Sequence, residues 1–136
     1  MQESFIQGGK KMTVTVSGEV PAKKNSRLWN TKTKFLFPNR HYTEWHGIAM
    51  LEVRSQLKGW KAPVPCSVTV TFIHGDRIRR DGDNGLSSVM DMLKDAGVII
   101  DDCWKYVAHE EVWHDYDKGK PRCVIEINDY SPRGTV

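Results

Sequence analysis

Residues 77–102 read "RIRRDGDNGLSSVMDMLKDAGVIIDD", a stretch that combines a helical pattern with a cluster of acidic residues. It holds six of the chain's seventeen acidic residues and opens with three arginines, in a protein of formal net charge +3. Neighbouring carboxylates repel one another unless a positive group lies among them. The flanking arginines, a divalent cation, or both can supply that positive charge.

The apolar residues of this stretch recur at the spacing of one helix face: Leu86, Val89, Met90 and Leu93. Asp83 or Asn84 can cap the start of this helix, and Gly97 can end it. A second helix is expected over residues 41–60 and ends at Gly59. Its approximate apolar stripe is Trp45, Ile48, Ala49, Leu51, Val53 and Leu57.

Four further segments alternate apolar and polar residues, which is typical of strands. They are residues 12–21, 63–75, 103–114 and 121–129. Residues 21–39 show no sustained period and predict a long loop with a short hairpin around Asn30–Lys34. The order strand, loop, helix, strand, helix, strand, strand predicts an α+β fold with two main helices and a mixed β-sheet.

Length and composition limit the classes of protein to which the chain can belong. At 136 residues we expect one domain, residues 1–136, with residues 1–11 as a flexible N-terminal arm. The apolar runs are too short to span a membrane, and the first residues do not resemble a signal peptide. Three scattered cysteines predict neither a disulfide framework nor a zinc site, so a reduced, cytoplasmic location is expected.

The charge is unevenly distributed along the chain. Residues 1–40 contain eight Lys or Arg and two acidic residues, whereas most of the acidic excess lies between Asp81 and Asp102. A basic arm beside an acidic pocket suits an enzyme that grips a polyanion and holds metal ions at its scissile phosphate. A soluble protein with a solvated basic tail accounts for the same charges.

The acidic residues form two pairs, Asp81 with Asp83 and Asp101 with Asp102. In extended backbone, residues two apart face the same side, and a strand–helix–return path can bring the second pair near the first. Clustered carboxylates suit Mg²⁺ or Mn²⁺, which can activate water and stabilise charge on a phosphodiester. The alternative is structural: Asp83 caps the helix, Asp81 pairs with Arg79 or Arg80, and the second pair lies in a solvated turn.

Three motifs together resemble the RusA family of Holliday junction resolvases. They are "RRDGDN" followed by a helix with an internal Asp and "AGVIIDD", the N-terminal "SGEVPAKKNSR", and the late "KGKPRCVIEI". The resemblance implies a small homodimeric endonuclease with a RusA-like fold and no organic cofactor. It would nick four-way DNA junctions symmetrically with Mg²⁺ or Mn²⁺, leaving 5′-phosphate and 3′-hydroxyl ends, and a phage or prophage origin would suit it.

The resemblance also assigns roles to individual residues. Asp81, Asp83 and Asp102 match the catalytic, metal-binding aspartates, while Asp101 and Asp91 match acids that support them. Phosphate contacts are expected from the basic loop, which is the predicted loop over residues 21–39, and from the two arginines before Asp81: Lys23, Lys24, Arg27, Arg79 and Arg80. The two arginines can instead pair with the aspartates.

The sequence departs from the RusA pattern on the second helix. The family pattern places an apolar residue and a lysine where this chain has Gly85 and Ser87. Losing one such electrostatic donor typically lowers the rate by roughly 10²–10³-fold. A second function therefore stays open: a branched-DNA binding protein whose nuclease activity is weak or lost.

Overall fold

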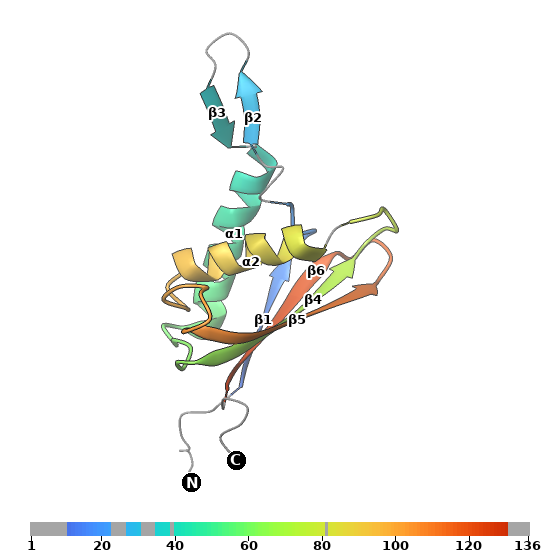
Figure 1. The fold of residues 1–136 in the computed structure, drawn as a ribbon. Coiled ribbons are helices and arrows are strands. Elements are labelled where there is room, and N and C mark those ends of the chain that lie inside the picture. Colours follow the sequence, from blue (N-terminus) through green and yellow to red (C-terminus); the bar gives the residue numbers. More distant parts are fainter. Residues whose placement is uncertain (1–10, 23–26, 31–34, 39, 81, 131–136) are drawn as a thin grey trace.

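A computed structural model describes residues 11–22, 27–30, 35–38, 40–80 and 82–130 (Figure 1). For residues 27–30, 35–38 and 82–84 it describes the backbone alone. The elements follow one another as β1 (Met12–Ser17), β2 (Arg27–Asn30), β3 (Phe35–Pro38), α1 (Arg40–Leu57), β4 (Cys66–His74), α2 (Gly82–Asp95), β5 (Val107–Tyr116) and β6 (Arg122–Asp129).

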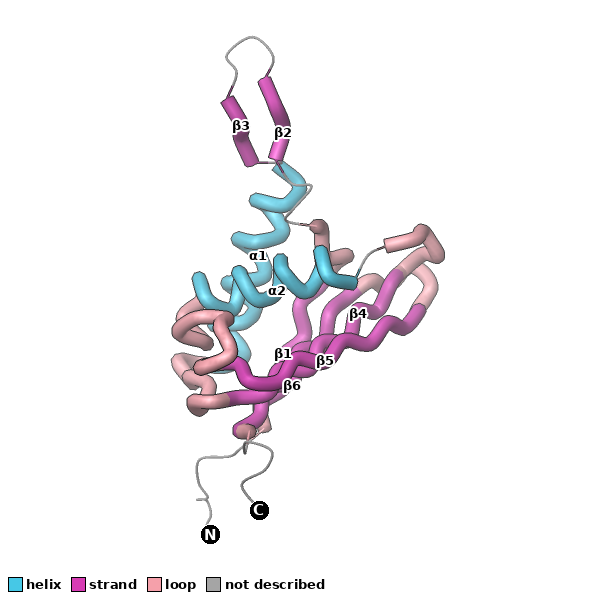
Figure 2. The backbone as a smooth tube through the Cα atoms, viewed as in Figure 1, coloured by secondary structure: helices cyan, strands magenta, loops and turns pink. Residues whose placement is uncertain are grey.

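The four longer strands form one mixed sheet, with both helices against the same face (Figure 2). The strand order is β1-β6-β4-β5; β4 and β5 are parallel, whereas β6 is antiparallel to both of its neighbours. The predicted α+β fold with a mixed sheet and two main helices is therefore confirmed. The strands β2 and β3 pair separately on either side of residues 31–34, where the sequence predicted a hairpin.

The core lies between the sheet and the helices. Along β4, every second residue from Cys66 to Phe72 is buried, because alternate side chains of a strand face the same side. The helix α2 buries its apolar face on this layer, as its spacing predicted. The largest fully buried side chains include Val14, Val16, Val68, Val70, Val89, Met92, Leu93, Ile125 and Ile127.

The predicted apolar stripe of α1 is partly wrong. The helix buries residues three or four apart, which places them on a single face: Tyr42, Trp45, Ala49, Val53 and Leu57. Ile48 and Leu51 lie on other faces and are 55% and 67% exposed. Within the described residues, no helix is long and apolar enough to cross a membrane.

The unit β4–α2–β5 determines where the acidic residues lie. Because β4 and β5 are parallel, α2 must carry the chain from the carboxyl end of β4 back to the amino end of β5. Gly97 ends α2 as predicted, with φ at 82°. The Val98 N–H donates to the Leu93 carbonyl (3.0 Å) and the Gly97 N–H to the Lys94 carbonyl (3.1 Å), the pattern of a Schellman cap.

Candidate active site

The loop after β4 is held by an ion-pair cluster centred on Arg80. The Asp76 carboxylate accepts the Ile78 N–H (3.0 Å) and two hydrogen bonds from the Arg80 guanidinium, at 2.7 and 3.2 Å. The Nε of Arg80 also lies 3.2 Å from Oε2 of Glu19, which follows β1. The Arg80 hydrogen bond, followed by the Ile78 N–H, lowers the pKa of Asp76. Arg80 thus anchors the backbone directly before Asp81, and Arg79 is exposed.

Of the two aspartates in "RRDGDN", Asp81 lies outside the described residues, and Asp83 is described by its backbone, in the first turn of α2. Gly85 in the next turn lies against Phe72 of β4. A Cβ at Gly85 would stand 2.9 Å from Cζ of the Phe72 ring, closer than real Cβ contacts. The start of α2 therefore packs on the sheet at a separation that requires glycine at this position.

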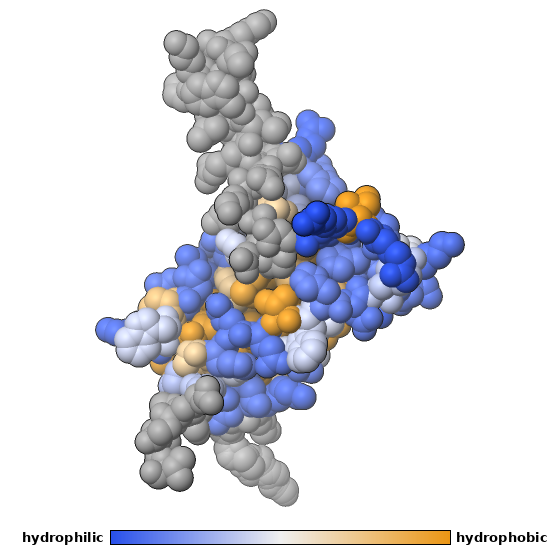
Figure 3. Space-filling model, turned by 45° about the vertical axis from the view of Figure 1, so that its right-hand side comes forward, coloured by the Kyte–Doolittle hydropathy of each residue, from blue (hydrophilic) through white to orange (hydrophobic). Residues whose placement is uncertain are grey.

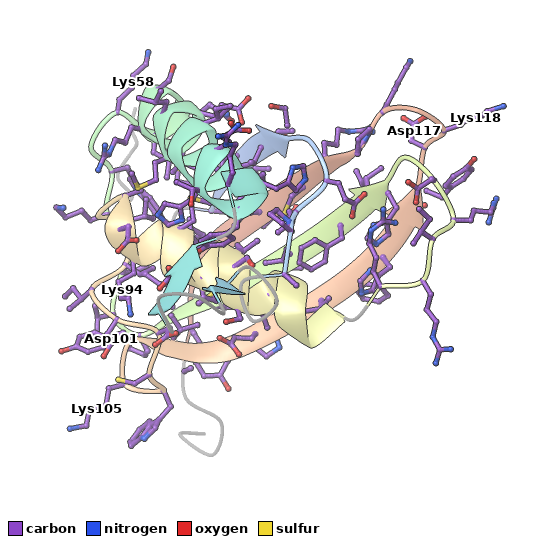
Figure 4. The ribbon with its side chains drawn as sticks, turned by 90° about the horizontal axis from the view of Figure 1, so that it is seen from above. Lys58, Lys94, Asp101, Lys105, Asp117 and Lys118 are labelled. Carbon is purple, nitrogen blue, oxygen red and sulfur yellow. The ribbon has the colours of Figure 1, made fainter. Side chains whose placement is uncertain are left out.

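Asp101 and Asp102 lie at the other end of α2. The Asp102 N–H donates to Oδ1 of Asp101 (2.8 Å), and Nζ of Lys94 in the last turn of α2 lies 3.9 Å from the same oxygen. Figure 4 shows Lys94 and Asp101 together at this end, with Asp117 and Lys118 at the opposite end of the sheet. Burial, and then the negative charge of Asp102, raises the pKa of Glu110 in β5.

Within one chain, the backbone of Asp83 and the turn at Asp101 and Asp102 lie at opposite ends of α2. The helix between them has 14 residues and spans about 20 Å at about 1.5 Å per residue. A crossover helix returns the chain to the amino end of the next parallel strand, not to the end that it left. The backbone of Asp83 therefore lies at the opposite end of α2 from Asp102, whereas the sequence suggested that the two aspartates converge within one chain.

Asp91 belongs to a polar cluster between the two helices. Its Oδ2 accepts a hydrogen bond from the Tyr42 hydroxyl (3.2 Å), which also lies 3.3 Å from Nδ1 of His46. The Nε2 of His46 is 2.9 Å from Oδ2 of Asp95. One ligand atom from each of His46, Asp91 and Asp95 lies within 4.8 Å of the others, close enough to share a cation. Eight residues, or about 12 Å of helix, separate Asp91 from Asp83.

The chain leading into the basic loop is fixed against α2. Ser88, a fully buried side chain, donates a hydrogen bond to the Pro21 carbonyl, and Val20 is buried beside it. The predicted phosphate contacts Lys23 and Lys24 follow directly but lie outside the described residues. Arg27 opens β2, with its backbone alone described. Figure 3 brings forward the end of the sheet that carries the loop after β4 and the β5–β6 turn, and shows hydrophilic residues there beside smaller hydrophobic patches.

A comparison with protein-family models matches residues 17–128 to Endodeoxyribonuclease RusA. The chain belongs to the RusA family. A curated relative from Aquifex aeolicus (strain VF5), named Crossover junction endodeoxyribonuclease RusA, is 32% identical over 112 residues. That match covers 82% of this chain and 87% of the relative. The membership suggested by the "RRDGDN" and "AGVIIDD" motifs is confirmed.

The fold accounts for one of the two departures from the RusA pattern. At Gly85, the Phe72 ring occupies the space that a side chain would need. Ser87, where the RusA pattern has a lysine, is exposed on α2, so a longer side chain would fit there. Lys94 lies at the far end of α2 and pairs with Asp101, so it does not replace that lysine.

Two histidines to which the sequence assigned no role lie at the carboxyl ends of the parallel strands. His74 is the last residue of β4, and His114 of β5 lies in register with Phe72. Alternation within one strand does not reveal such a pair, because the pairing depends on the register between two strands.

Proposed function

We propose that this chain is a Mg²⁺-dependent, structure-selective endodeoxyribonuclease that resolves Holliday junctions by symmetric nicking. The observation that carries the proposal is RusA family membership over residues 17–128, which include the two aspartates before and within the first turn of α2. The products would be a 5′-phosphate and a 3′-hydroxyl. Mn²⁺ is the natural substitute, because the carboxylate ligands suit both ions.

The metal site would be assembled from two protomers. Asp81 and Asp83 of one protomer would hold the cation together with Asp102 of the partner subunit, because about 20 Å of helix separates these residues within one chain. A two-fold axis would create two identical sites, one for each strand to be nicked. Exposed apolar side chains flank the acidic turn: Trp104 is 76% exposed and Ile100 is 67% exposed, as expected of an interface.

Each group of residues has a distinct task in this proposal. A cation held by these aspartates would supply positive charge at the scissile phosphate. Arg80, held by Asp76 and Glu19, would keep the backbone before Asp81 in position. Asp101 would orient Asp102 through the hydrogen bond between them. The remaining basic side chains would bind DNA phosphates: Lys23, Lys24, Arg27 and Arg79.

The test uses a synthetic four-way junction beside a linear duplex of the same sequence, with and without Mg²⁺. We expect paired symmetric nicks in the junction, no nicks without metal, and no cleavage by Asp83→Asn. Asp129→Asn, which removes an exposed carboxylate at the end of β6, should cleave normally and serves as the matched control. Equal nicking by wild type and Asp83→Asn would contradict the proposal.

A second function is favoured by Ser87, which stands where the RusA pattern has a lysine. In that case the protein would bind branched DNA tightly, in a salt-sensitive manner, and cleave it slowly or not at all. Ser87→Lys discriminates between the two functions, because restoring a missing electrostatic donor can raise a rate by roughly 10²–10³-fold. A large gain in the nicking rate indicates that the wild-type protein binds branched DNA but has lost most of its nuclease activity. An unchanged nicking rate indicates that another group takes the role of the lysine.

A further inference from the structure

Three aromatic rings stack at the carboxyl ends of β4 and β5 and continue into a hydrogen-bonded chain. The His114 ring lies 5.4 Å from the Phe72 ring and 5.1 Å from the His74 ring, nearly parallel to the latter. Nε2 of His74 is 2.8 Å from Nδ1 of His114. On its other side, the His74 Nδ1–H donates to Oε2 of Glu19 at 2.6 Å. The chain therefore runs from a carboxylate through two imidazoles to Nε2 of His114.

This chain contacts Arg80 of the "RRDGDN" segment, and the Phe72 ring stacked on it contacts Gly85 directly after that segment. Oε2 of Glu19, which accepts from His74, also lies 3.2 Å from Nε of Arg80, the residue before Asp81. The Phe72 ring lies both against His114 and under Gly85, two residues after Asp83. Parallel strands bind ligands beyond their carboxyl ends, and both histidines lie at that end.

The hydrogen-bond pattern determines how a proton moves through the chain. The two nitrogens that face each other share one proton, and Nδ1 of His74 keeps its own because Glu19 accepts from it. In the neutral pair, His114 donates to His74, so its Nε2 is a free base. A proton taken up at Nε2 would make His114 an imidazolium, and transfer of the shared proton would place that charge on His74, beside the Glu19 carboxylate. Among the described residues, no group hydrogen-bonds to Nε2 of His114.

The surroundings favour the neutral form of the His114 imidazole. Burial, followed by the positive charge of His74, lowers the pKa of His114, and Glu19 opposes this effect. Among the described residues, Asp76 of the loop after β4 interacts electrostatically with His74, and Arg80 and Cys123 interact with Glu19. Burial raises the pKa of the Cys123 thiol to about 12, so it does not compete for the proton.

Building on the function proposed above, we infer that His114 is the general base of the reaction. In the step, a water oxygen bonds to phosphorus while the bond from phosphorus to the 3′-oxygen breaks. The water proton passes to Nε2 of His114, and the 3′-oxygen takes a proton from solvent. His74 and Glu19 act as positioning residues that hold the transferred charge. The protonated pair of His74 and His114 carries one positive charge. It lies at the same end of α2 as Ser87, which stands where the RusA pattern has a lysine.

The test measures the rate of junction nicking at saturating Mg²⁺ across pH 5–9. General-base catalysis typically contributes roughly 10²–10⁴-fold, so His114→Gln should lose about that factor with unchanged junction affinity. His114→Ala should be rescued by added imidazole. Glu19→Gln should shift the rising limb of the pH profile to lower pH, because the imidazolium loses its stabilising carboxylate.

His109→Gln is the matched control. His109 of β5 is hydrogen-bonded to Ser67 near the amino ends of β4 and β5, away from the hydrogen-bonded chain of His74 and His114. It should keep both the wild-type rate and the wild-type pH profile. If His114→Gln nicks like wild type while Asp83→Asn is inactive, the proposed role of His114 is wrong and the proposed nuclease function is supported. If the wild-type protein does not nick junctions with Mg²⁺ or Mn²⁺, both proposals are wrong.

Discussion

Mixing two inactive variants tests whether the metal site is shared between protomers. Asp83→Asn removes a proposed metal ligand at the start of α2, and Asp102→Asn removes the proposed ligand beyond its end. In a heterodimer of the two, one site combines both substitutions. The other site combines the unsubstituted Asp81 and Asp83 of one protomer with the unsubstituted Asp102 of the partner subunit. A site built across the interface therefore recovers activity on mixing.

The size of the recovery follows from the two-fold symmetry. Equal amounts of the two variants, exchanged freely, give heterodimers as about half of all dimers, each with one intact site. Single nicks should reach about one quarter of the wild-type rate. Paired nicks should stay near background, because resolution of a junction needs both sites of one dimer. A supercoiled plasmid with an extruded cruciform separates these products, since one nick relaxes the plasmid and two opposed nicks linearise it.

The same experiment can rule out a metal site shared between protomers. If each site is formed within one chain, every protomer in the mixture carries a damaged site and mixing restores nothing. Unfolding and refolding the two variants together, then showing heterodimers by differently tagged protomers, ensures that exchange has occurred. Heterodimers that are present and inactive would contradict the shared site. Asp129→Asn mixed with Asp102→Asn is the control that measures recovery with one substitution outside the site.

Three further substitutions test the packing around the site. Gly85→Ala should destabilise the protein by about 1–2 kcal/mol in urea unfolding, because the clash with Phe72 outweighs the gain in helix propensity; an unchanged midpoint would contradict the close contact. Tyr42→Phe should cost about 1 kcal/mol by the same assay and leave the nicking rate unchanged. Asp76→Asn should lower Tm at neutral pH. Because pairing with Arg80 lowers the pKa of Asp76, the difference from wild type should persist to about pH 4 and vanish in stronger acid; a difference that grows in acid would contradict the pairing.

Local patterns sufficed for much of the fold, because alternation and helical spacing are properties of short segments. The apolar spacing of α2 and its end at Gly97 were predicted correctly. The stripe of α1 was only partly right, because Ile48 and Leu51 have the same chemistry as the buried residues but face away from the sheet. The face that a helix buries depends on its neighbours in space, which a single window of sequence does not contain.

The site was harder to predict because it depends on strand direction. Alternation identifies β4 and β5 but does not show that they are parallel, and the parallel pairing sends Asp102 to the far end of α2. The same pairing brings His114 beside His74 and Phe72. Family motifs align residues along the chain and carry no information on which subunit supplies each one.

If the metal site is shared as proposed, the separation of Asp83 from Asp102 would leave each protomer inactive alone. One end of the β4–α2–β5 unit carries Asp83 in α2 and the imidazole chain at His114; the other carries Asp102 near Glu110. An acidic turn of this kind lowers its repulsion when it meets a cation held by another subunit. Dimer formation would then bring ligand, cation and base together in one step. A nuclease built this way would cut only as a dimer, which suits a junction in which two strands must be nicked together.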